Sequence, residues 1–141
     1  MNKTLKKTLQ ILGITTLVST AILLPAIYRQ NFPEKINIVS DLIRIVKEEE
    51  KTVRKDSAIK HIYWTYGQVE WGTAGSANLS EGNYLVILDK AGRNRTTIRH
   101  ELYHIYAGHC DAATKKGEWT TKDKIRNELT ANIYSYYGLR L

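Results

Sequence analysis

Residues 100–109 read HELYHIYAGH, and their first five letters form the pattern H-E-x-x-H. On a helix with 3.6 residues per turn, His100 and His104 lie one above the other on the same face, so both imidazoles can bind one metal ion. Glu101 lies about 100° away around that helix, where it can hold a metal-bound water without being a ligand. Two neutral imidazoles favour zinc as the ion.

The residues around the motif support a helix with two different faces. Ile98, Leu102 and Ile105 fall on one helical stripe, whereas the two histidines lie roughly opposite it. One face can therefore pack on a core while the other lines a cleft. The alternative is a helix on which His100 and His104 are only surface residues. The motif, the stripe and a candidate third ligand favour the metal site.

A catalytic zinc site needs a third protein ligand and keeps a fourth position open. Glu128 lies in the predicted last helix, on a stripe that is otherwise mostly apolar and contains Ile125, Leu129, Asn132, Ile133 and Tyr136. A carboxylate in the middle of such a face needs a cationic partner. Zinc bound to His100 and His104 would supply it. The alternative partner is a basic side chain such as Arg126 or Arg99.

Several other residues are candidates for supporting roles. Asn132 follows Glu128 by one helical turn and could bond to the second ring nitrogen of a ligand histidine, although ordinary amide packing explains it equally well. His109 and Cys110 are rival third ligands, but the extended motif H-E-x-x-H-x-x-G-x-x-H needs glycine where this chain has Ala107. His109 more simply lines the cleft or ends the helix. Candidate oxyanion donors are His109, Tyr106, Tyr136 and Tyr137.

The N-terminal part of the chain predicts a membrane segment. Residues 1–7 carry three lysines, and residues 8–28 carry no charge. As a helix, this uncharged run would be about 31 Å long, close to the ~30 Å hydrocarbon core of a bilayer. We expect a single transmembrane anchor with a cytoplasmic N-terminus and an extracytoplasmic domain. A cleaved signal peptide followed by secretion is the alternative. Residues 29–35 would link the segment to a domain spanning 36–141.

The first half of that domain contains patterns of one helix and two strands. Apolar residues at the i, i+3, i+4 and i+7 positions of 39–46 predict an amphipathic helix, and the charged run 47–56 reads as a solvated helix face rather than a docking surface. Residues 59–71 have strand composition, and the apolar run 84–88 predicts a buried strand. The segment 72–83, rich in glycine, serine and asparagine, predicts a loop.

The second half contains signals for helix starts and ends. Asn94 is a candidate N-cap of the motif helix. The polar segment 110–119 predicts a loop, after which Thr120 and Asp123 match a capping signal and Gly138 is a plausible stop. The expected fold class is α+β: an amphipathic helix, a small antiparallel sheet, and two helices that meet at the metal.

The amino-acid composition of the chain excludes some classes of function. The chain has 141 residues, which suits one small domain, and it is 43% hydrophobic and 25% charged, as in ordinary globular proteins. Its net charge of +7 includes the N-terminal lysines, and no stretch carries a dense basic cluster. We therefore expect no nucleic-acid partner. Cys110 is the only cysteine, so no internal disulfide can form.

Two short motifs together resemble a known family. The pattern H-E-L-Y-H, followed at 128–132 by E-L-T-A-N, is similar to the gluzincin metallopeptidases, which combine H-E-x-x-H with a later E-x-x-A-[ND]. The most similar group is the compact ImmA/IrrE-like peptidases. The resemblance implies a zincin-like domain with His100, His104 and Glu128 as zinc ligands, Glu101 as catalytic base and Asn132 as a supporting residue.

Other features of the chain bear on this resemblance. His109 and an N-terminal membrane span also resemble the HtpX/CAAX-protease-like group, although those proteins usually have more chain between the motif and the last ligand. Tyr103 departs from the pattern, because a small residue is common before the second histidine. Its side chain would either narrow the cleft or point away from it.

The resemblance implies a membrane-anchored zinc metallopeptidase that acts on a protein or peptide substrate. Glu101 would take a proton from the zinc-bound water and pass it to the leaving amine. The alternative is a non-catalytic, membrane-tethered zinc-binding domain with a regulatory or interaction role. A fourth protein ligand from His109 or Cys110 would favour this alternative, because structural zinc sites are closed.

Overall fold

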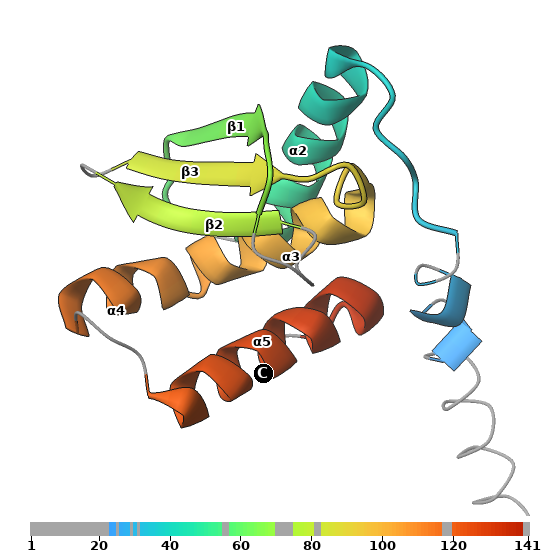
Figure 1. Ribbon diagram of the computed structural model, residues 1–141. Coiled ribbons are helices and arrows are strands. Elements are labelled where there is room, and N and C mark those ends of the chain that lie inside the picture. Colours follow the sequence, from blue (N-terminus) through green and yellow to red (C-terminus); the bar gives the residue numbers. More distant parts are fainter. Residues whose placement is uncertain are drawn as a thin grey trace, which may run out of the picture.

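The computed structural model describes residues 23–139 except 25, 29, 31, 55–56, 70–74, 81–82 and 117–119. These residues form a small α+β domain in which helices pack against a three-stranded sheet (Figure 1). The fold class is therefore as predicted. The elements are α2 (Val39–Arg54), β1 (Ile62–Tyr66), β2 (Gly75–Ser80), β3 (Asn83–Leu88), α3 (Arg95–Tyr106), α4 (His109–Lys116) and α5 (Thr121–Tyr137).

The sheet has the order β1-β3-β2, with β3 in the centre. Tyr84, Val86 and Leu88 of β3 are buried and alternate with less buried residues, which confirms the predicted buried strand. The predicted antiparallel sheet is wrong for one pair, because β1 runs parallel to β3 while β2 runs antiparallel to it. The chain reverses direction twice, into β2 and again into β3, so β1 and β3 point the same way.

The strand β2 lies where the sequence predicts a loop. Gly75–Ser80 pairs along its length with Asn83–Leu88, so the loop prediction for 72–83 is wrong for the residues of β2. Small and polar residues have low strand propensity, but here β3 supplies a complete partner ladder. Because β2 ends the strand order, its other edge makes no strand pairing among the residues that the structure describes. The expected strand within 59–71 is present but shorter, at Ile62–Tyr66.

The motif helix α3 is the centre of the domain. It lies between the sheet and α5, and it packs against α2, β2 and α5 (Figure 1). Ile98, Leu102 and Ile105 are completely buried, as the predicted stripe requires. Asn94 caps the helix, since its side-chain oxygen accepts a hydrogen bond of 3.0 Å from the backbone N–H of Thr97.

The helix α2 is present where expected, but its buried face only partly matches the predicted apolar stripe. Leu42 is buried and Val46 packs on the core as predicted, whereas Val39 and Ile43 are exposed. The other buried residues are Ile45, Glu49 and Val53. The reading of 47–56 as a solvated face is thus wrong for Glu49 and Val53. Glu49 is buried because two arginines of α3 pair with its carboxylate, a long-range contact that a local pattern does not show.

A short helix, α4, replaces most of the loop predicted for 110–119. Gly108 ends α3 with a φ of +77°, a conformation that glycine adopts readily, and α4 begins at the next residue. Lys60 fixes this junction: its Nζ donates to the Ile105 carbonyl at 3.0 Å, and to Asp111 Oδ2 at 3.2 Å. The Tyr84 hydroxyl donates to the other Asp111 oxygen at 2.6 Å.

Both predicted ends of α5 are confirmed. Thr120 is the N-cap, and its hydroxyl oxygen accepts a hydrogen bond of 3.2 Å from the backbone N–H of Asp123. Gly138 ends the helix with a φ of +73° and donates its N–H to the Tyr134 carbonyl at 2.8 Å. These caps satisfy backbone groups that a helix end leaves without intrahelical partners.

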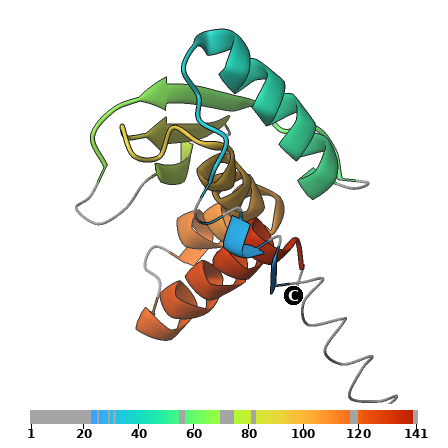
Figure 2. The ribbon, with the colours of Figure 1, turned by 90° about the vertical axis from the view of Figure 1, so that its right-hand side faces the viewer.

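The predicted membrane segment 8–28 lies mainly outside the described residues. Among the helices that are described, none is both long and apolar enough to cross a bilayer. The described helical residues between 23 and 30 lie near the C-terminal end of α5 (Figure 2). From the linker 29–35, Lys35 forms a β-bridge with Asn94 next to the start of α3.

Candidate metal centre

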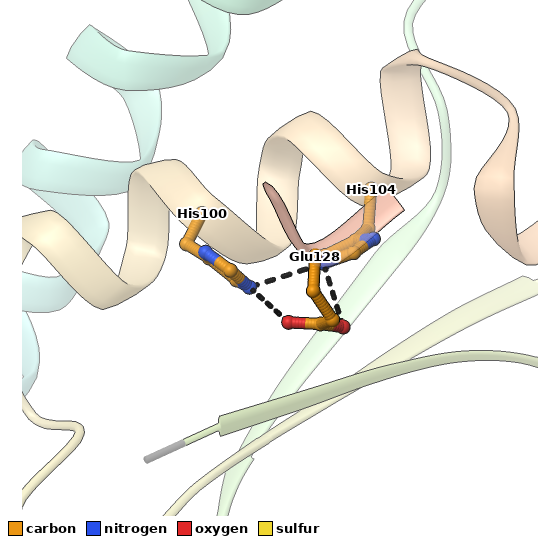
Figure 3. A group of neighbouring side chains, drawn as sticks. All are labelled: His100, His104 and Glu128. Atoms are coloured by element: carbon orange, nitrogen blue, oxygen red, sulfur yellow. Dashed lines mark hydrogen bonds and ion pairs between the residues drawn. The ribbon is translucent and has the colours of Figure 1, made fainter. Parts of the chain in front are cut away.

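The two motif histidines and the predicted third ligand come together in the structure. His100 and His104 lie one turn apart on α3, and α5 brings Glu128 to them (Figure 3). The Nε2 atoms of the two rings are 3.0 Å apart. Glu128 Oε2 lies 3.4 Å from His100 Nε2, and Oε1 lies 3.4 Å from His104 Nε2. One candidate ligand atom from each residue thus faces a common point.

These distances suit a single metal ion. Zinc binds nitrogen and oxygen at about 2.0–2.2 Å, so two tetrahedral ligands lie about 3.2–3.5 Å apart. The candidate ligand atoms of His100, His104 and Glu128 all lie within 4.8 Å of one another. Two imidazoles and one carboxylate are also the donor set of catalytic zinc sites, which leave one position for water or substrate. The triad therefore fits a divalent ion, and its donors are those that zinc prefers.

The packing of α5 on α3 places Glu128. Asn127, Ala131, Tyr134 and Ser135 form the buried face of α5. Ala131 is small, and the Tyr134 ring stacks on the Tyr103 ring with centroids 4.9 Å apart. Tyr103 is buried in this contact, so its bulk joins the two helices. Glu128 follows Asn127 by about 100° around the helix, which puts it at the rim of the interface beside the histidines.

The predicted surroundings of Glu128 need a correction. Its side chain is 59% exposed, and the neighbouring Ile125 and Leu129 are 63% and 56% exposed. The apolar stripe that suggested a buried carboxylate therefore faces outward. The alternative partners of Glu128 are also occupied elsewhere: Arg126 lies 3.5 Å from Asp123, and Arg99 pairs with Glu49.

Glu101 is buried next to the triad and against β2. A β-carbon at Gly75 would lie 2.8 Å from Glu101 Oε1 and 2.9 Å from the Thr97 methyl, so only glycine leaves room for this carboxylate. Burial raises the pKa of Glu101; with the opposing charge of His100 and a smaller upward contribution from Glu128, the pKa is about 7. The sequence reading did not identify Gly75, because its segment looked like a loop.

His109 supports His104 from the first turn of α4. The Nδ1 atoms of the two rings are 3.0 Å apart, so the His104 nitrogen that faces away from the triad has a hydrogen-bond partner. Burial lowers the pKa of His104 to about 4, with His100 adding to the effect. A neutral His104 that donates its Nδ1–H to His109 presents a lone pair at Nε2, as a metal ligand requires.

The rival third ligands do not join the triad. His109 presents Nδ1 to the outer side of His104, and Cys110 is buried with its thiol donating to the Ala77 carbonyl of β2 at 3.4 Å. Burial raises the pKa of this thiol to about 12, which disfavours the thiolate that binds metals. Within the described ranges, the metal-ligand group contains only His100, His104 and Glu128.

The remaining candidates have mixed outcomes. Asn132 is exposed, and its side chain bonds to neither histidine; its carbonyl accepts from Ser135 at 3.0 Å. The predicted supporting contact is thus made by His109 instead. The Tyr106 hydroxyl donates to Glu50 and accepts from the Lys60 backbone, so it is engaged away from the triad. Tyr136 is half-buried on α5, and its role as an oxyanion donor stays a prediction.

Comparison with family models, curated proteins and solved structures found no match to this chain. The function therefore has to be inferred from the chemistry of the site itself.

Proposed function

We propose that this chain is a membrane-anchored, zinc-dependent metallopeptidase of the gluzincin type. One observation carries the proposal: a buried carboxylic acid, Glu101, lies directly beside a triad that fits zinc but has no fourth protein ligand among the described residues. A structural zinc site is closed by four protein ligands and has no use for a buried acid. A hydrolytic site needs both the open position and the acid.

The residues divide the chemistry between them. His100, His104 and Glu128 would hold zinc, which lowers the pKa of a bound water and polarises the carbonyl of the scissile bond. Glu101 would take a proton from the water as its oxygen bonds to the carbonyl carbon, and would deliver that proton to the amine nitrogen as the C–N bond breaks. Burial raises the pKa of the Glu101 carboxyl in the metal-free chain, and the charge of a bound zinc ion would lower it again, so the group would be a carboxylate that can accept a proton beside the ion.

The fold also offers a place for the substrate. The outer edge of β2 is unpaired within the described part of the sheet, and Gly75 at its start touches Glu101. An extended peptide added to this edge would pass in front of the triad. The uncharged residues 8–28 would anchor the domain in the membrane, with the domain on the extracytoplasmic side.

The test combines metal analysis with cleavage of an unfolded generic protein by the zinc-loaded full chain. Glu101→Gln should keep one zinc per chain and lose cleavage by about 10²–10⁴-fold. Glu128→Ala should lose zinc binding, because two imidazoles alone hold the ion weakly. Glu34→Gln is the matched control, since Glu34 is an exposed glutamate that pairs with Arg44 and Arg95. Undiminished cleavage by Glu101→Gln would refute the assigned base.

Neither candidate for a fourth protein ligand is directed at the triad, so the non-catalytic alternative lacks the closed zinc site that would favour it. His109 is directed to the far side of His104, and the Cys110 thiol is bonded to the backbone of β2. If the chain binds zinc with full affinity but cleaves no protein, the result would support the non-catalytic alternative. Retention of full zinc affinity by Glu128→Ala would instead remove the proposed third ligand.

A further inference from the structure

The outer face of α5 carries exposed apolar side chains, interrupted by the exposed Asn132. α5 is the layer farthest from the sheet, on the other side of α3 (Figures 1 and 2). Its buried side already packs on α3, yet Ile125 and Leu129 on the opposite side are 63% and 56% exposed. Tyr136 extends the same helical stripe and is half-buried. Large exposed apolar side chains that line up on one face commonly mark an interaction surface.

Basic side chains flank this apolar face. Lys122, Lys124 and Arg126 are exposed on the first two turns of α5. Within the described ranges, neither lysine makes an ion pair, while Arg126 lies 3.5 Å from Asp123. The carboxylate of Glu128 is turned toward the two histidines. The outward surface of α5 therefore combines apolar residues with net positive charge, a combination that suits anionic lipid headgroups.

Exposed apolar residues also occur on α2, which allows a comparison with α5 within the same chain. Ile43 is 63% exposed, the same fraction as Ile125. Its basic neighbour Arg44, however, is paired with Glu34 at 2.5 Å and with Glu48 at 3.4 Å. Lys47, one turn after Ile43, is nevertheless exposed and makes no ion pair within the described ranges, so α2 also offers positive charge. The two helices differ in position instead: α2 lies on the other side of α3, whereas the described residues between 23 and 30 lie near α5 (Figures 1 and 2).

We propose that the outer face of α5 docks on an anionic lipid bilayer. Ile125 and Leu129 enter the boundary between headgroups and acyl chains, while the two lysines reach the phosphates with their long side chains. Leu23, Leu24 and Ile27 are also exposed, and their segment lies near the C-terminal end of α5 (Figure 2). Because Ile125 and Leu129 belong to the first half of α5, a bilayer that contacts both apolar surfaces would run along the length of this helix.

This orientation has a consequence for the metal triad. Leu129 directly follows Glu128, so a docked α5 holds the triad at the membrane surface. If the proposed peptidase function holds, the preferred substrates are protein segments that lie close to the bilayer, rather than peptides free in solution. This consequence rests on the proposed function, whereas the docking itself does not.

The docking can be measured without metal or substrate. In the full chain carrying Cys110→Ala, which removes the only cysteine, a spin label is attached through Leu129→Cys or, as matched control, through Ile43→Cys. Both sites are exposed, so circular dichroism should show unchanged folding. Collision of the label with membrane-dissolved oxygen and with a water-soluble nickel chelate is then compared, with a chelator present to keep the protein metal-free.

We expect vesicles of phosphatidylglycerol in phosphatidylcholine to raise the ratio of oxygen to nickel collisions several-fold at position 129 and to leave position 43 unchanged. Lys122→Glu combined with Lys124→Glu should reverse most of the change at position 129, because the charge attraction is lost. Phosphatidylcholine alone should give a much smaller change.

Three results would overturn the proposal. The label at position 129 could stay as accessible to water as the label at position 43. The change could appear without vesicles and grow with protein concentration, which would identify a second copy as the occupant. It could also be equal on uncharged vesicles and insensitive to the lysine reversal, which would exclude anionic lipid as the partner. Failure of peptide cleavage affects none of these readouts, so the two proposals fail independently.

Discussion

Two buried glutamates on opposite sides of α3 have opposite electrostatic surroundings. Glu49 of α2 is 2% exposed, and Glu101 of α3 is 4% exposed. Glu49 accepts from Arg95 at 2.7 Å and from Arg99 at 2.5 Å. Burial pushes its pKa upward, but the hydrogen bonds and charges of the two arginines outweigh burial and hold the pKa below its usual range. Glu101 has no comparable cation among the residues that the structure describes, and its pKa rises to about 7.

This difference in electrostatic surroundings distinguishes a region that stabilises the fold from a region that is suited to a catalytic role. Between α2 and α3, a buried carboxylate is fully paired and fixes how the two helices pack. Between α3, β2 and α5, a carboxylate of the same type is buried without a compensating arginine, which costs stability. Proteins retain such a group where its protonation is used, because perturbed acids cluster at functional sites. The same substitution at the two positions should therefore have opposite effects.

The largest expected effect is that of Glu49→Gln. The amide cannot pair with the charge of Arg99, which is 14% exposed, whereas Arg95 keeps its pairs with Glu34 and Glu48, so the free energy of unfolding should fall by about 3 kcal/mol. Urea denaturation measures the change. Glu50→Gln on the next position of α2 is a control for helix propensity. A loss below about 1 kcal/mol would mean that the pairing is not structural.

Glu101→Gln should act in the opposite direction. In the metal-free protein at pH 8, replacing an uncompensated buried carboxylate by a neutral amide should raise the free energy of unfolding by about 1–3 kcal/mol. The measurement is urea denaturation with a chelator present. A stabilised variant that has lost cleavage would show that Glu101 is retained for chemistry. A destabilised variant would contradict the contrast with Glu49.

Gly75→Ala tests the space that β2 leaves for Glu101. The added β-carbon would lie 2.8 Å from Glu101 Oε1, so the carboxylate or the strand must shift, and stability should fall by about 1–2 kcal/mol. Cleavage should fall further than zinc affinity, because the acid moves but the three ligands do not. Gly67→Ala is the control, since its β-carbon would meet only the Cγ2 methyl of Ile87, at 3.1 Å, and no group of the candidate site.

The smallest expected effect is the pH dependence that Glu49 contributes. Its pKa is lower in the folded state than the usual value of 4.5, so its stabilisation is complete above about pH 4.5 and is lost as the pH falls through the folded value. One proton changes stability by at most about 1.4 kcal/mol per pH unit. Below pH 4.5, the stability of Glu49→Gln should therefore fall less steeply with acidification than that of the parent. Equal slopes would argue against the lowered pKa.

Features that depend on short-range patterns could be predicted from the sequence. The stripe of Ile98, Leu102 and Ile105 is fully buried, and Asn94 caps α3 as expected. The capping signal of Thr120 and the glycine stop of α5 are also present. The spacing of His100 and His104 follows from the helix itself, so local periodicity was enough to place these two residues.

Features that depend on distant partners could not be predicted. β2 has poor strand composition and exists because β3 pairs with it. Glu49 reads as one charge in a solvated run until Arg95 and Arg99 approach it from α3. Glu128 was correctly predicted to lie near the histidines, but the argument from a buried apolar stripe was wrong because its apolar neighbours point outward. The packing of Ala131 and Tyr134 on α3 is what turns the carboxylate toward the histidines.

The triad draws its donors from two helices, with α4 and residues 117–119 between them in the chain. An ion bound there would hold α5 to α3, because α5 could not separate from the domain without removing Glu128 from the ion. By mass action, such an ion at 100 times its dissociation constant adds about 2.7 kcal/mol to the native state. The lifetime of the chain against proteolysis would then depend on the supply of the ion, and a shortage of it would lower the amount of folded protein.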